Sequence, residues 1–214
     1  MVCVVRDVAF DEVSQLRRRA GSSTGSAGGE AREEPAVDEA GRARAAVPSI
    51  AVIRRALQSC GWLLIPVVAL NLGFASNLPE AYQPQVFWKD IPVALGFAEN
   101  VYRVGVFVLP CLVPLAWRSR TQRAGLMLFV VGFALYSASW ALLILTPGGT
   151  LARSLVGFTS PAWTPGFWLA GLVVMADTSF IARFHPRWPL LVLSVLFLGC
   201  HVGHATFVFT RLGR

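Results

Sequence analysis

Five long apolar segments constrain this chain more than any other feature of its sequence. They cover residues 56–75, 92–116, 124–145, 162–182 and 188–209. A helix needs about 20 mostly apolar residues to cross the roughly 30 Å hydrocarbon core of a bilayer, and each segment is long enough. We therefore predict an all-α, polytopic transmembrane bundle of five helices.

The composition agrees with a membrane protein and argues against a nucleic-acid partner. Of the 214 residues, 55% are hydrophobic and 14% are charged, whereas charged residues make up about a quarter of a soluble domain. The basic residues separate apolar segments and do not form one stripe with interleaved aromatic residues. We expect the lipid bilayer as the main partner, together with a possible membrane-protein partner.

The N-terminal part of the chain differs in composition from the rest. Residues 1–48 are rich in Gly, Ser, Ala and charged residues and are too polar to form a core. Residues 1–21 lack the consecutive apolar run of a signal peptide. We predict a disordered cytoplasmic tail over 1–48 and a transmembrane domain over 49–214.

The arginine distribution predicts the orientation, because cytoplasmic flanks of membrane spans are enriched in Arg and Lys. With a cytoplasmic N-terminus, the outer flanks hold four basic residues and two acidic ones, Glu80 and Asp90. The inner flanks then hold seven basic residues: Arg54, Arg55, Arg118, Arg120, Arg123, Arg183 and Arg187. We expect the N-terminus inside and the C-terminus outside, in the plasma membrane.

Polar side chains interrupt four of the five apolar segments at a similar height. A helix rises about 1.5 Å per residue, and this rise places six of them roughly 18 to 25 Å above the inner ends. An arginine in mid-membrane costs about 2.5 kcal/mol or more, so such groups are expected to face one another. The sequence predicts a polar pocket in the outer leaflet formed by Asn71, Glu99, Asn100, Arg103, Tyr136, His201 and His204.

The spacing of these residues leaves several kinds of chemistry open. Buried polar groups often only hold helices together, while histidine near neutral pH exchanges protons readily, which suits a proton relay or a polar-solute site. Glu99, His201 and His204 are also a possible set of ligands for a divalent metal. Because Arg103 would compete for Glu99 and repel a cation, no cofactor is expected.

Two short motifs resemble those of the CAAX-type intramembrane proteases. AENVYR supplies Glu99 and Arg103 at the Glu–Arg spacing of that family, and FLGCH supplies Phe197 and His201 at its Phe–His spacing. The first glutamate of the family motif is Ala98 here, and the later histidine–asparagine motif is missing. The resemblance implies glutamate–histidine hydrolysis as an alternative chemistry.

Three classes of function follow from these observations, and the sequence does not decide whether the chain is an enzyme. The leading class is a small binding or transport-like membrane protein, or an accessory subunit, with a polar pocket. The second is a membrane-embedded hydrolase that uses Glu99 with His201 and His204. The third is a structural partner of another membrane protein, because Gly199 and Gly203 permit close approach of a helix.

Overall fold

The computed structural model describes residues 57–116 and 119–213, which all belong to the unit Arg54–Arg214. Helix accounts for 77% of these residues and no strand occurs among them, so the all-α prediction is confirmed for this part. The predicted tail over residues 1–48 lies outside the described residues.

Four stretches of helix are long and apolar enough to cross a membrane: Cys60–Asn77, Val93–Leu112, Arg120–Leu145 and Arg187–Arg211. Helices of this kind indicate a membrane protein. The first comprises η1 (Cys60–Leu63), α4 (Leu64–Phe74) and η2 (Ala75–Asn77), the second α6 (Val93–Val108) and η4 (Leu109–Leu112), and the others α7 (Arg120–Leu145) and α12 (Arg187–Arg211).

The segment predicted over 162–182 begins earlier and ends earlier than expected. It forms α10 (Ser160–Trp163) and α11 (Pro165–Met175), and the residues after Met175 are not helical. Side chains from other elements bind the last carbonyl groups of α11: Gln122 donates to the Met175 oxygen and Arg187 to the Val174 oxygen. These side chains replace the backbone amides of a further helical turn, which would otherwise donate to the same carbonyl oxygens.

The segment predicted over 92–116 also ends early, at Leu112. Val113 is extended, as expected for a residue that precedes a proline. An antiparallel bridge joins Ser59 to Pro114, and the Cys60 amide donates to the Val113 oxygen at 2.8 Å. The bridge joins the start of η1 to the end of η4, so the predicted starts and ends of both segments shift by a few residues.

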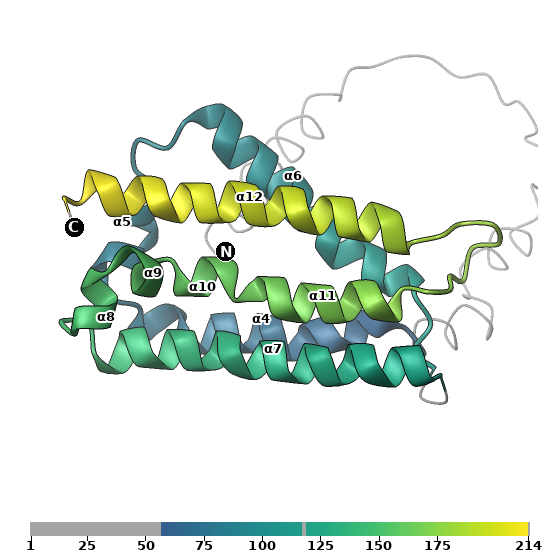
Figure 1. The fold of residues 1–214 in the computed structure, drawn as a ribbon. Helices are drawn as coiled ribbons and strands as arrows, with labels where there is room; N and C mark the ends of the chain where they lie inside the picture. The colour runs from purple at the N-terminus through teal and green to yellow at the C-terminus, as the bar shows by residue number, and fades with distance from the viewer. Residues whose placement is uncertain (1–56, 117–118, 214) are drawn as a thin grey trace, which may run out of the picture. The chain divides into compact units, whose positions relative to one another are not determined.

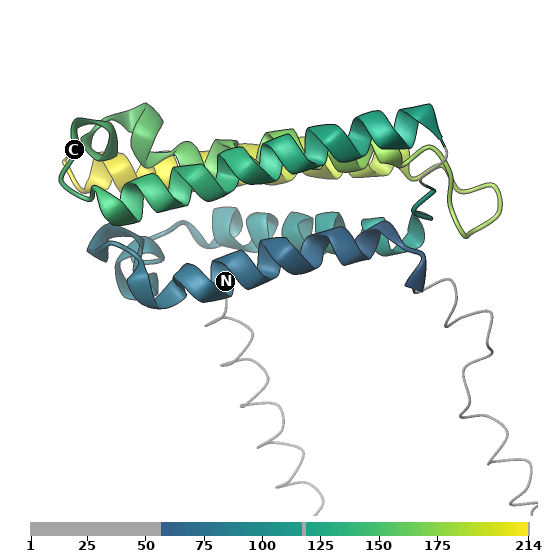
Figure 2. The same ribbon diagram turned by 90° about the horizontal axis from the view of Figure 1, so that it is seen from below.

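The long helices lie in two layers, as Figures 1 and 2 show. One layer contains α7, α11 and α12, and the other contains α4 and α6. Within the described residues, α11 packs along α7 and beside α12, while α12 packs on α6. The helix α4 contacts α7 but does not pack along α6. The α6–α12 contact is therefore the most extensive contact between the two layers.

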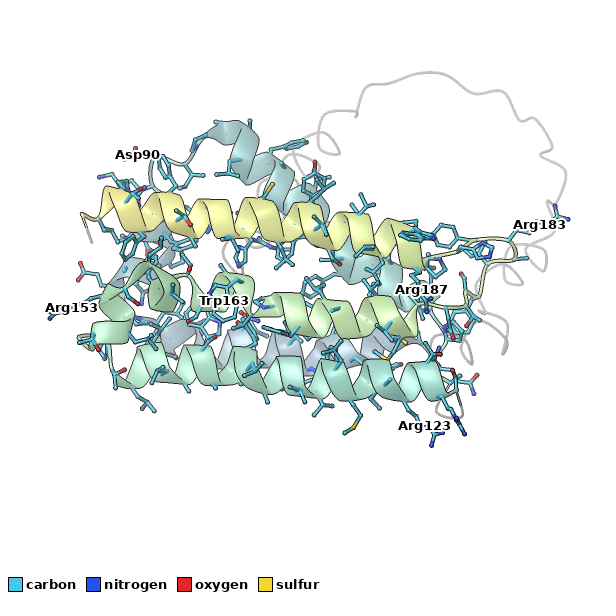
Figure 3. All side chains as sticks on the ribbon, in the orientation of Figure 1. Asp90, Arg123, Arg153, Trp163, Arg183 and Arg187 are labelled. Carbon is cyan, nitrogen blue, oxygen red and sulfur yellow. The ribbon has the colours of Figure 1, made fainter. Side chains whose placement is uncertain are left out.

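The short elements gather at one end of this unit, which we call the loop end. They are η3 (Glu80–Tyr82), α5 (Pro84–Phe87), α8 (Thr150–Arg153) and α9 (Leu155–Phe158). The Tyr82 hydroxyl donates to the Phe158 oxygen at 2.6 Å and thereby joins the two loops. Figure 3 shows Asp90 and Arg153 at the loop end and Arg123, Arg183 and Arg187 at the other, which we call the arginine-rich end.

Glycines allow α7 and α11 to approach closely. A Cβ atom at Gly132 would lie 2.3 Å from the Trp168 nitrogen, and one at Gly171 would lie 2.5 Å from the Phe129 nitrogen. Small residues at such contacts let helix backbones pack directly in a membrane. By contrast, a Cβ at Gly199 or Gly203 would meet nothing within 4 Å among the described residues.

The glycine contacts predict different effects of one methyl group at two positions. Gly171→Ala forces α11 away from α7 and should lower the free energy of unfolding by about 1–3 kcal/mol. Gly199→Ala adds the same methyl group to an open face of α12 and should leave stability unchanged. Thermal unfolding of both purified variants in one detergent measures the difference, and equal midpoints would contradict the packing described.

Candidate functional site

The carboxylate of Glu99 is the centre of a polar network between α6 and α12. Its Oε2 lies 2.7 Å from Nδ1 of His204, and its Oε1 lies 2.9 Å from Nδ1 of His201. Arg103 Nη2 donates to the same Oε1. Glu99 is 0% exposed. Both oxygens of this buried carboxylate therefore have nitrogen partners.

Helix geometry explains why these four side chains meet. Glu99 and Arg103 are four residues apart and His201 and His204 three apart, so each pair shares a face of its helix. The packing of α12 on α6 brings the two faces together. Glu99 lies roughly 9 Å from the start of α6 at 1.5 Å per residue. The network therefore lies in the half of the helices nearer the loop end.

A backbone carbonyl fixes the other side of the His204 ring. Nε2 of His204 lies 3.1 Å from the Phe87 oxygen. The ring centroids of Phe87 and Trp88 lie 4.5 and 4.6 Å from that of His204. Arg211 donates to the oxygens of Val86 and Lys89, which holds this loop in place. The loop after α5 thus covers the network at the loop end.

The accessible side of the network is formed by Arg103 and His201, whose side chains are 13% and 23% exposed. The His201 ring stacks on Phe197 with centroids 5.2 Å apart, and Arg103 Cζ lies 5.8 Å from the same Phe197 centroid. Arg103 Nη1 also donates to Asn100 Oδ1 at 2.8 Å. Phe197 therefore packs against both side chains from one side.

The remaining two residues of the predicted pocket form a separate pair. The Tyr136 hydroxyl donates to Asn71 Oδ1 at 2.7 Å, and Asn71 Nδ2 donates to the Val67 oxygen at 2.7 Å. This pair joins α7 to α4. The structure thus places Glu99, Asn100, Arg103, His201 and His204 in one hydrogen-bonded network and joins Asn71 to Tyr136 in a separate pair.

The donor and acceptor roles around His204 follow from its partners. A carbonyl oxygen only accepts hydrogen bonds, so His204 Nε2 carries a proton that it donates to Phe87. The 2.7 Å contact between His204 Nδ1 and Glu99 Oε2 requires one further hydrogen, on the nitrogen or on the oxygen. The imidazole and the carboxylate consequently share a proton in a fully buried position.

The geometry does not arrange the predicted metal ligands around an ion. Nitrogen and oxygen ligands about 2.1 Å from a tetrahedral zinc lie roughly 3.4 Å apart, whereas these contacts are 2.7 and 2.9 Å. The positive charge of Arg103 also lies against the Glu99 carboxylate, where it would repel a metal cation. Within the described ranges, no three His, Cys, Asp or Glu side chains are grouped to hold a metal ion.

Gln122, near the start of α7, is a buried polar residue that the sequence analysis missed. It is 2% exposed, and its Nε2 donates to the oxygens of Pro114 and Met175 and to Asp177 Oδ1 at 3.0–3.1 Å. Its Oε1 accepts from the Ala116 amide. The spacing of Ser119 and Gln122 is that of a helix-capping pair, which indicates the start of α7 but does not indicate these partners of the Gln122 side chain.

Comparison of the chain with protein-family models, with curated proteins and with solved structures finds no match.

The contacts of Gln122 predict that the arginine-rich end depends on this side chain. Gln122→Ala removes the donor to the Pro114, Met175 and Asp177 oxygens and the acceptor of the Ala116 amide, and it should lower the free energy of unfolding by about 1–3 kcal/mol. Thr121→Ala is the control, since Thr121 is the exposed neighbour on the same helical turn. Chemical unfolding in detergent compares the two, and a loss for Thr121→Ala as large as for Gln122→Ala would contradict the assignment.

Proposed function

We propose that this chain is a five-span protein of the plasma membrane with its N-terminus inside and its C-terminus outside. The span added to the four long helices is the α10–α11 pair, the fourth in chain order. It runs beside α7 and α12 between the two ends of the unit. The pair is short, roughly 24 Å at 1.5 Å per residue. Arg120, Arg123, Arg183 and Arg187 at one end support the orientation.

Its function, in this proposal, is the binding or transport of a polar solute in the outer half of the membrane, coupled to proton exchange at Glu99. The observation that carries the proposal is the buried carboxylate with an imidazole on each oxygen. Two imidazoles on one carboxylate allow a proton to be exchanged among His201, Glu99 and His204, with His201 at the accessible side.

A flux measurement on the full chain tests the proton step. Protein in liposomes with a trapped pH-sensitive dye is given a potassium diffusion potential through valinomycin, and the interior pH is followed. Glu99→Gln preserves the size of the side chain but cannot exchange a proton, so the flux should fall at least tenfold. His185→Gln is the control, because His185 is exposed at the arginine-rich end. Equal fluxes in Glu99→Gln and the unaltered protein would refute the proposal.

Labelling of single cysteines tests the orientation. In a variant whose four natural cysteines are serine, Gly148→Cys lies in an outer loop and His185→Cys in an inner one. A membrane-impermeant maleimide should label Gly148→Cys in intact cells and His185→Cys only after permeabilisation. The opposite pattern would reverse the orientation, and labelling of both in intact cells would remove the α10–α11 span.

The hydrolase remains the second candidate, and one observation favours it. The two motifs that resemble the CAAX-type proteases meet in space, with Glu99 in contact with both Arg103 and His201. This candidate predicts hydrolytic activity that is lost in Glu99→Gln, and in its metal-dependent form it predicts bound metal in the purified protein. Elemental analysis of the unaltered protein and of His201→Ala decides whether a metal is held there.

The third candidate is a structural partner subunit. It is supported by the open face of α12 at Gly199 and Gly203, where the described residues leave space for a neighbouring helix. It predicts a second membrane protein that co-purifies with the chain and is lost on Gly203→Leu. No nucleic acid is involved in any of the three candidates.

A further inference from the structure

The hydrogen bonds of the Glu99 network determine its charge without locating the shared proton. If the proton lies on His204 Nδ1, the imidazole is positive and the carboxylate negative, because Nε2 is also protonated. If it lies on Glu99 Oε2, both groups are neutral. The charges of His204 and Glu99 sum to zero in either case.

Arg103 contacts the Glu99 carboxylate, but its positive charge is additional to the His204–Glu99 balance and leaves the network with one uncompensated positive charge. Arginine stays protonated in proteins, and His201 adds no negative charge in either protonation state. The other carboxylates in the described ranges, Glu80, Asp90 and Asp177, make no ion pair there. The network therefore carries a net charge of at least about +1 within a membrane-spanning helix pair. A charge held at such depth is normally paired.

We infer that the network binds an acidic group, a carboxylate or a phosphoryl group, at the accessible face formed by Arg103 and His201. The inference rests on the proposed function and names the class of its solute. Two of the five N–H groups of Arg103 have hydrogen-bond partners among the described residues, Asn100 Oδ1 and Glu99 Oε1. The remaining donors of a guanidinium match the paired oxygens of a carboxylate or phosphate.

His201 supplies the second contact. Its Nδ1 faces Glu99, and its Nε2 is not among the buried polar atoms that lack a partner, which leaves this nitrogen at the accessible side. His201 can hold a proton on Nε2. The binding or release of an anion at this nitrogen can therefore be accompanied by the uptake or release of that proton. The anion site and the proton path thus share one imidazole.

The acidic group can belong to a free solute or to the headgroup of an anionic lipid. Arg103 lies roughly 15 Å from the start of α6 at 1.5 Å per residue, which is deeper than a lipid phosphate in an undisturbed leaflet. The depth favours a small acid. An experiment with and without anionic lipid separates the two sources.

The test is a titration of the full chain in nanodiscs of phosphatidylcholine. Sodium acetate or inorganic phosphate is added at constant sodium chloride, and the ¹⁵N signal of His201 Nε2 and calorimetric heat report binding. We expect saturable binding of at least one of the two anions and none of acetamide, the neutral analogue of acetate. Nanodiscs that contain phosphatidylglycerol should show weaker anion binding only if the headgroup occupies the site.

Three variants assign the binding to the charge of Arg103. Arg103→Gln removes the excess charge and should weaken anion binding at least tenfold. Arg153→Gln removes an exposed arginine at the loop end and should not. Glu99→Gln can retain each hydrogen bond, because its amide donates to His204 and its carbonyl oxygen accepts from Arg103 and His201. Its network keeps the same net charge but should lose proton flux, so the flux reports on the proton step separately from the anion site.

The outcomes separate this inference from the proposed function. Anion binding by Arg103→Gln equal to that of the unaltered protein overturns the inference, as does unaltered protein that binds neither acetate, phosphate nor anionic lipid. The second criterion holds even if Arg103→Gln does not fold. Loss of anion binding in Arg103→Gln with unchanged proton flux in Glu99→Gln supports the anion site and refutes the proton step alone.

Discussion

The contact of the Glu99 carboxylate with two imidazoles and a guanidinium is the interaction on which the α6–α12 pair depends. A carboxylate withdrawn from water is unstable unless hydrogen-bond donors replace the solvent. Here all the donors come from α12 and from the next turn of α6. Separation of the helices would leave the carboxylate in hydrocarbon with Arg103 alone. The polar network therefore fixes both the position and the register of α6 on α12.

Two kinds of helix contact operate in the same unit. The α7–α11 contact uses Gly125, Gly132 and Gly171 and brings backbones together through van der Waals packing. The α6–α12 contact uses charged and hydrogen-bonding side chains. The proton exchange proposed at Glu99 would alter this polar contact and leave the glycine contact as it is. The loop held by Arg211 covers the polar contact from the loop end.

The sequence was sufficient for some features because they depend on length and periodicity alone. Apolar length predicted the long helices, and the rise per residue predicted that Glu99, Arg103, His201 and His204 reach one height. Height does not specify which helices are neighbours, so the pairing of Asn71 with Tyr136 away from Glu99 was not predictable. The Phe87 carbonyl and Gln122 were missed because their roles depend on which loop covers which helix end.

The most direct test of the Glu99 network is the ¹⁵N spectrum of the His204 ring in the full chain, in nanodiscs at neutral pH. The account predicts a protonated Nε2 in the unaltered protein and in Glu99→Gln. It predicts that Nδ1 shows a shared proton in the unaltered protein and becomes a bare acceptor in Glu99→Gln. An unprotonated Nε2 in either protein, or a proton that stays on Nδ1 in Glu99→Gln, would contradict it.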